Sequence, residues 1–137
     1  MDTPVSLTRA LTLELINGEG GVRPLDAELR YDNRDPYAVA ACFDTGGTSV
    51  CWVFGRDLLA RGLFSPTGDG DVHVWPCLDA QGRAVTMIEL TSPDGEALMQ
   101  AQSQELSDFL RRTEALVPSG SETMHLNMDQ VLAQLLA

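Results

Sequence analysis

The sequence contains no lysine, so its nine positive side chains are all arginines, set against 20 aspartates and glutamates. The net charge is -11 over 137 residues. Without lysine, the chain cannot form the lysine-containing phosphate loop of nucleotide-binding proteins or a lysine Schiff base. Excess negative charge also repels phosphate backbones, which bind to basic surfaces. The composition therefore argues against nucleic-acid binding. The high net charge is typical of a protein that is kept soluble by the repulsion between its charges.

Cysteine and histidine are also scarce. The cysteines Cys42, Cys51 and Cys77 form no CxxC pair, and His73 and His125 are not separated by the spacing of metal ligands. A structural zinc site is therefore not predicted. A GxSxG elbow is also missing, and no nucleophile is placed by sequence beside a histidine. We predict no cofactor and no enzymatic activity.

Long apolar runs are missing too. No run approaches the roughly 20 residues of a membrane helix, and the first residues do not have the basic and apolar pattern of a secretory signal. The length suffices for one hydrophobic core and is too short for two. We expect a single soluble domain over residues 1–137, located in the cytoplasm.

The first part of the chain predicts strands. Apolar residues recur at odd positions from Val5 to Leu15, which is the alternation of a half-buried strand. A glycine-rich loop at 17–21 follows. A second strand is predicted over 27–31, and Asp32–Pro36 is predicted to form a turn because proline restricts the residue before it.

Residues 37–43 and 50–54 predict a β-hairpin. Gly46–Gly47 can adopt the positive φ angles of a two-residue turn, which would place Cys42 opposite Cys51. Both faces are apolar in this register, so we expect the hairpin to lie centrally, covered on each side. The opposed cysteines could form a disulfide. Because the cytoplasm keeps thiols reduced, we interpret them instead as core residues.

The second half changes from strands to helices. A short helix is predicted over 56–61, with Gly62 as its C-cap. Strands are predicted over 72–75, where Pro76 stops the strand, and over 84–90. Both are short enough to be edge or end strands.

Two amphipathic helices are predicted at the C-terminal end. The long one has Ser92 as its N-cap and continues to about Val117, because apolar residues recur there at three- and four-residue spacing. The short one begins at Asn127 and carries Leu132 and Leu135 on its apolar stripe. At about ten residues it is too short to be stable alone, so it must dock on another surface.

Five strings between Leu29 and Gly120 resemble, in their order and spacing, the SsgA-like sporulation and cell-division proteins of filamentous actinobacteria. They are LRYDNRDPYAV from Leu29, WVFGRDLL from Trp52, PTGDGDVHVWP from Pro66, SPDGEAL from Ser92 and FLRRTEALVPSG from Phe109.

The resemblance implies an α+β fold with a twisted, mostly antiparallel sheet, similar to the Whirly-type fold. It also implies a homotrimer, no cofactor, and a role at division septa in recruiting the tubulin-like protein FtsZ, sometimes through another SsgA-like protein.

Three functional hypotheses follow. The first is an adaptor for division proteins, and the second is a Whirly-like single-stranded nucleic-acid-binding protein, which the charge opposes. The third, a small-molecule or enzymatic domain, has no supporting motif. Aromatic residues are frequent in interfaces, so the candidate partner contacts are Trp75, Trp52 and Phe54, although the last two also suit a core. Leu132 and Leu135 of the terminal helix complete the set.

Overall fold

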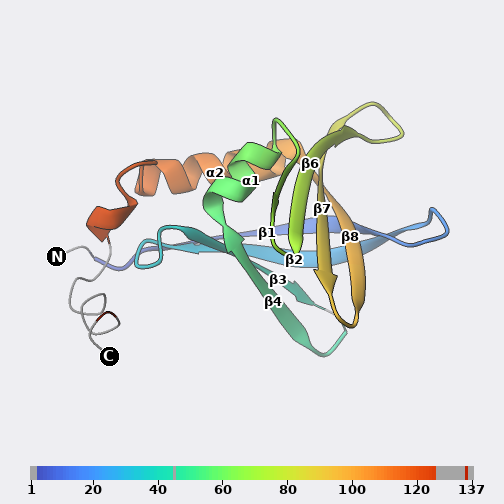
Figure 1. The fold of residues 1–137 in the computed structure, drawn as a ribbon, viewed down its shortest axis with the longest axis horizontal. Helices are drawn as coiled ribbons and strands as arrows, with labels where there is room; N and C mark the ends of the chain where they lie inside the picture. Colours follow the sequence, from blue (N-terminus) through green and yellow to red (C-terminus); the bar gives the residue numbers. More distant parts are fainter. Residues whose placement is uncertain (1–2, 45, 126–134, 136–137) are drawn as a thin grey trace.

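The fold consists of one curled antiparallel sheet and two α-helices, as a computed structural model shows for residues 3–44, 46–125 and 135 (Figure 1). The strand order in this part of the chain is β4-β3-β2-β1-β8-β7-β6-β5, and all neighbours are antiparallel. The predicted α+β class is therefore confirmed. The strands are β1 (Ser6–Ile16), β2 (Val22–Asp32), β3 (Ala38–Asp44), β4 (Ser49–Gly55), β5 (Thr67–Asp69), β6 (Val72–Leu78), β7 (Ala84–Ser92) and β8 (Gly95–Gln102).

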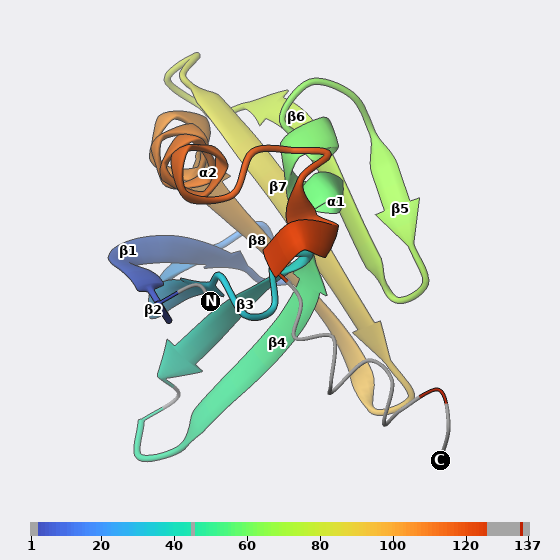
Figure 2. The same cartoon turned by 90° about the vertical axis from the view of Figure 1, so that its left-hand side faces the viewer.

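Each α-helix follows a run of four strands. α1 (Arg56–Gly62) comes directly after β4, α2 (Ser103–Leu116) comes directly after β8, and the 3₁₀ helix η1 (Glu122–His125) follows α2. The two halves of the sheet are joined where residues 14–16 of β1 pair with residues 98–100 of β8. Away from these three pairs the halves separate, and α2 packs there against β1, β7 and β8 (Figure 2).

The core lies between the two halves of the sheet and the helices. In β1 the buried residues Leu11 and Leu13 are at odd positions, as the alternation predicted. Odd positions of β2 and β3 also point into the core. The helix α2 contributes the apolar face that its spacing predicted, formed by Leu106, Phe109 and Leu110.

Residues 95–102 correct the prediction of a helix from Ser92. They form β8, which pairs with β7 along its whole length, and α2 begins only at Ser103. Ser92 Oγ accepts a hydrogen bond from the Asp94 N–H at 3.2 Å, and Gly95 has a φ of 150°, so these residues form a hairpin turn. Serine and aspartate bond to nearby backbone groups in turns as well as in helix caps. Pairing with β7 and β1 overrode the local helical spacing.

The predicted hairpin of β3 and β4 has the expected register but a different position. Cys42 lies opposite Cys51, and Gly46 and Gly47 have φ angles of 76° and 118°. The prediction of a central hairpin is wrong, because β4 is the end strand of the sheet. Only the face toward the core is covered, and Val53 on the other face is 61% exposed.

The opposed cysteines Cys42 and Cys51 form a disulfide, which corrects their interpretation as reduced core thiols. Cys42 is buried, but Cys51 lies exposed on the edge strand. The third cysteine, Cys77, is free and exposed.

The predicted ends of two elements also change. β6 continues through Pro76 to Leu78. Because the pairing of β5 with β6 ends at Val74, that side of β6 is open at Pro76, where a missing N–H is tolerated. Gly62 ends α1, but its φ is not positive. It is instead required by space, since a Cβ there would lie 2.3 Å from Cγ1 of Val74.

The predicted terminal helix from Asn127 falls outside the described residues, apart from Leu135. None of the helices that the structure describes is long and apolar enough to cross a membrane.

Candidate partner-binding surface

The edge strand β4 is unusually unprotected. Among the described residues no strand pairs with its outer side, and its seven residues include no charged residue and no proline. Val50 and Val53 are 45% and 61% exposed. Natural edge strands are commonly shortened, charged or interrupted by proline, which prevents pairing with other chains. The opposite edge, β5, follows this rule with three residues that include Asp69. An apolar, uncharged edge such as β4 indicates a surface for protein contact.

The register shows which backbone groups of β4 point outward. The Arg56 N–H donates to the Tyr37 oxygen at 2.8 Å, just beyond the paired residues of β3 and β4. Because hydrogen-bonded pairs alternate along an antiparallel ladder, Trp52 also bonds to β3, whereas Cys51 and Val53 direct their N–H and C=O groups away from it. The 4.0 Å between the Cα atoms of the Cys42–Cys51 pair agrees with a non-hydrogen-bonded position.

A groove of about 370 Å³ lies on the core-facing side of β4, between the β3–β4 and β7–β8 hairpins. Ser92, Asp94 and Glu96 of the β7–β8 hairpin bring polar groups to it. The rest of the lining is mainly apolar and includes Leu15, Leu25, Phe43, Val50, Trp52 and Met99.

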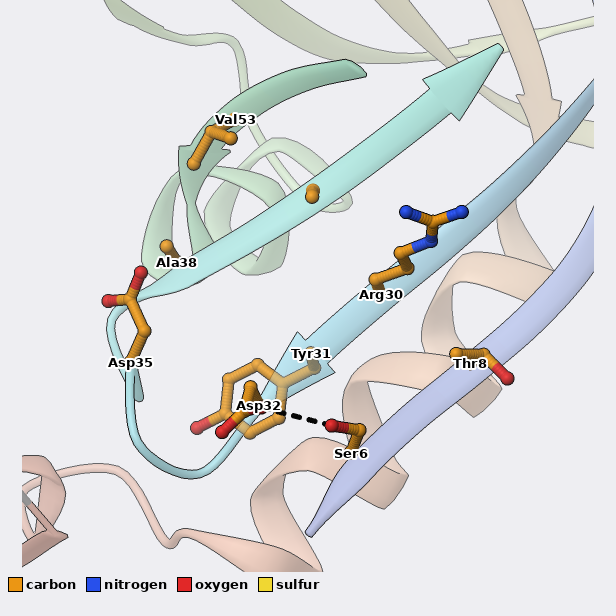
Figure 3. A pocket seen from close by; sticks show the side chains of 9 residues that line it. Ser6, Thr8, Arg30, Tyr31, Asp32, Asp35, Ala38 and Val53 are labelled. Atoms are coloured by element: carbon orange, nitrogen blue, oxygen red, sulfur yellow. Dashed lines mark hydrogen bonds between the residues drawn. The ribbon is translucent and has the colours of Figure 1, made fainter. Parts of the chain in front are cut away.

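A second hollow, of about 380 Å³, lies on the opposite face of the sheet (Figure 3). It is lined by the small side chains of Ala38 and Ala40 on β3 and by Val53 on β4, which leave space between bulkier neighbours. Arg30 and the hydroxyl of Thr8 also line it. β4 therefore contributes a side chain to a hollow on each face of the sheet.

Charged groups beside the second hollow are largely paired. Arg34 donates hydrogen bonds to both carboxylate oxygens of Asp32, at 3.0 and 2.7 Å, and Ser6 donates a third at 3.0 Å (Figure 3 shows the Ser6 bond). The Arg34 bonds, with a smaller contribution from Ser6, hold the pKa of Asp32 well below its usual range. Arg30 lies 2.6 Å from a carboxylate oxygen of Glu28.

Ion pairing also extends over the described surface, where six arginines pair with a carboxylate, and the buried Arg56 makes a seventh pair. The described residues offer no extended basic face for a phosphate backbone, and they contain no group of three or more side chains arranged to hold a metal ion.

Arg56 organises the scaffold behind this surface. Its guanidinium is buried, donates to the carbonyl oxygens of Thr113 and Val117 at 3.1 and 2.7 Å, and pairs with Glu122 at 2.7 Å. It also lies 5.3 Å from the centre of the Tyr31 ring. Three of the five strings that carry the family resemblance therefore meet at one buried cation, directly after the last residue of β4.

The predicted contact residues are placed differently from one another. Trp52 is half-buried and lines the groove, whereas Phe54 is 6% exposed and belongs to the core. Trp75 is half-buried on β6, away from the groove, in a small hollow with His73 and Glu89. We therefore leave Phe54 out of the candidate site. Leu132 lies outside the described residues, and Leu135 is 75% exposed.

Sequence reasoning missed the contribution of Val50 and Val53. Both were assigned to a hairpin with two apolar faces, and both faces of that hairpin were expected to be covered. The missing charge and proline in Ser49–Gly55 was visible in the sequence, but it indicates an exposed edge only once the strand order is known.

Comparison with known proteins identifies the family. Residues 25–122 match the family model described as Streptomyces sporulation and cell division protein, SsgA. The chain belongs to this SsgA family. It is 50% identical to the sporulation-specific cell division protein SsgB of Streptomyces coelicolor, covering 100% of this chain and 98% of the relative. It is 46% identical to SsgB of Kineococcus radiotolerans, covering 98% and 81%.

A solved SsgA-family structure has the same fold. The crystal structure of an SsgA-like sporulation-specific cell division protein from Thermobifida fusca superposes with a TM-score of 0.87 at 39% identity, covering 98% of each chain. The resemblance drawn from the five strings is thus confirmed. The SsgA match includes β4, both hairpins beside the groove, and Arg56; the residues of β1 that line the hollows precede it.

Proposed function

We propose that this protein is a non-enzymatic adaptor of sporulation-specific cell division, which recruits or positions FtsZ and other septum proteins at division septa. The observation that carries the proposal is the apolar groove beside the uncharged edge strand β4, with Trp52 in its lining. Half-exposed aromatic and aliphatic side chains around a preformed groove suit contact with a protein partner. The family's role in sporulation and cell division, named for SsgB relatives, supplies the setting.

Binding of single-stranded nucleic acid is the weaker alternative. It rests on an analogy of fold, which is poor support for function. The net charge of -11 and the ion pairing of seven arginines oppose it.

A fluorescent fusion expressed in sporulating hyphae tests the proposal, together with precipitation of FtsZ from the same cells. We expect foci at future septa and co-precipitation of FtsZ. A diffuse fusion that brings down no FtsZ would contradict the adaptor role.

Two tryptophan variants compare the candidate contacts. Trp52→Ala should weaken the complex by about 2 kcal/mol, roughly 30-fold, if the groove is the contact, because truncated interface aromatics have costs of this size. Trp75→Ala is the matched variant on another face of the sheet. A loss with Trp75→Ala alone, at unchanged melting temperature (Tm), would move the contact to β6.

A further inference from the structure

We propose that β4 binds an extended segment of its protein partner as an added ninth strand, whose alternate side chains enter the hollows on the two faces of the sheet and whose flanking residues are basic. This inference rests on the proposed function and specifies how the partner is bound.

The backbone of β4 can accept such a strand. Cys51 and Val53 direct N–H and C=O groups away from β3, as the register requires. Their side chains carry no charge that would repel an incoming backbone, and Val53 is largely exposed. An added strand forms its main-chain hydrogen bonds with such groups, and these bonds are independent of the partner's side chains.

The two hollows then supply specificity. Val53 lines the hollow on the outer face, and Val50 and Trp52 line the groove on the core-facing side. Consecutive side chains of a strand point to opposite faces. A single extended segment beside β4 therefore places successive side chains next to both hollows, whereas a helix laid in the groove would contact only one of them.

The charged residues around β4 indicate which kind of partner segment binds there. Asp94 and Glu96 are exposed beside the groove, and neither forms an ion pair with a described residue. Asp35 is exposed beside the outer hollow, and the whole chain carries -11. A segment flanked by arginine or lysine meets an attractive field at both ends. A second copy of this chain would bring a further -11 to the same edge.

The test begins with a phage-displayed library of random linear twelve-residue peptides, selected on the immobilised full-length chain, with the selected peptides then synthesised. We expect them to combine alternating apolar residues with basic ends. Binding should slow hydrogen exchange of the Cys51 and Val53 amides by at least about tenfold, while the Trp52 amide, already bonded to β3, changes little.

Val53→Lys should weaken peptide binding at least about tenfold through charge repulsion, at unchanged Tm. Val22→Lys is the control, because Val22 is 54% exposed on β2, away from both hollows. The affinity of Val22→Lys for the peptides should stay within about twofold of that of the original chain.

Several results would overturn the inference: a selection that yields no binder, peptides that leave the Cys51 and Val53 amides unprotected, or equal effects of the two lysine variants. Protection of these amides in the free chain would also overturn it. If that protection grows with protein concentration, a second copy occupies the edge; if not, the chain itself covers it.

The adaptor role is judged separately. Septal foci and FtsZ co-precipitation that persist in Val53→Lys would refute strand addition and leave the adaptor role intact. If the original chain shows neither septal foci nor FtsZ co-precipitation, the adaptor role is refuted, whatever the peptides show.

Discussion

Replacing Arg56 with methionine should lower the Tm by roughly 10 °C or more. Methionine fills a similar length but has no donor. The carbonyl oxygens of Thr113 and Val117 would then lose their guanidinium partner, at positions that are both 0% exposed. Because Arg56 is the first residue of α1, the hydrogen bonds that link this helix to the end of α2 would be lost as well.

The magnitude follows from the two carbonyl bonds. A hydrogen bond to a charged group contributes about 1.5–3 kcal/mol, so the pair contributes at least about 3 kcal/mol. A chain of this length gains roughly 0.29 kcal/mol per kelvin of entropy on unfolding, so that loss corresponds to roughly 10 °C. Arg56→Lys should fall between the variant and the original chain, because an ammonium lacks the planar fork that reaches several acceptors.

Thermal unfolding followed by circular dichroism measures the effect. Arg111→Met is the matched control, since Arg111 pairs with Asp108 on the exposed side of α2 and its side chain is 70% exposed. Such a pair contributes about 0–1 kcal/mol, so its Tm should change by about 3 °C or less. If Arg56→Met behaves like the control, the buried guanidinium does not hold α2 to α1.

Two further predictions concern other parts of the scaffold. Gly62→Ala should destabilise by about 2 kcal/mol in urea unfolding, because the new methyl would overlap buried Val74, whereas Gly18→Ala, whose Cβ would have no described atom within 4 Å, should be nearly neutral; equal unfolding midpoints of the two variants would contradict the packing. Asp32→Asn should be less stable than the original chain at neutral pH, with the difference shrinking as pH falls below about 4, because the stabilisation from the lowered pKa of the paired Asp32 is complete above the unfolded-state pKa and is lost as pH falls toward the folded-state pKa. A difference that stays constant from pH 7 to pH 3 would show that the Arg34 pairing is not its cause.

Local patterns predicted much of the first half of the fold. The odd-numbered leucines of β1 and the glycine pair before β4 act over a few residues, and both features recur in the structure. β8 was missed because Leu98 and Ala101 have helical spacing by coincidence. Its pairing with β7 and β1 involves residues that no local window compares.

The candidate site was predictable only in part. Trp52 was a candidate from its residue type, but its place beside an open groove depends on the curl of the sheet, which brings the β3–β4 and β7–β8 hairpins to one groove although β2 and β1 lie between them in the strand order. Phe54 is two residues away on the same face, yet it lies in the core. The alternation along β4 places both residues on one face. Which of them a partner can reach depends on how the core covers this end of the sheet.

Variants of Arg56 and Val53 distinguish two causes for a loss of septal foci. Arg56 directly follows β4, so loosening its hydrogen bonds would disturb the edge strand and could abolish septal foci without any partner contact being changed. Such a loss arises from a larger unfolded fraction, so it should be relieved in cells grown at a lower temperature. A lysine at position 53 places a charge on the edge and leaves the core intact, so its loss should persist at every growth temperature. Foci restored by cooling in Val53→Lys would mean that this residue stabilises the fold instead of contacting the partner.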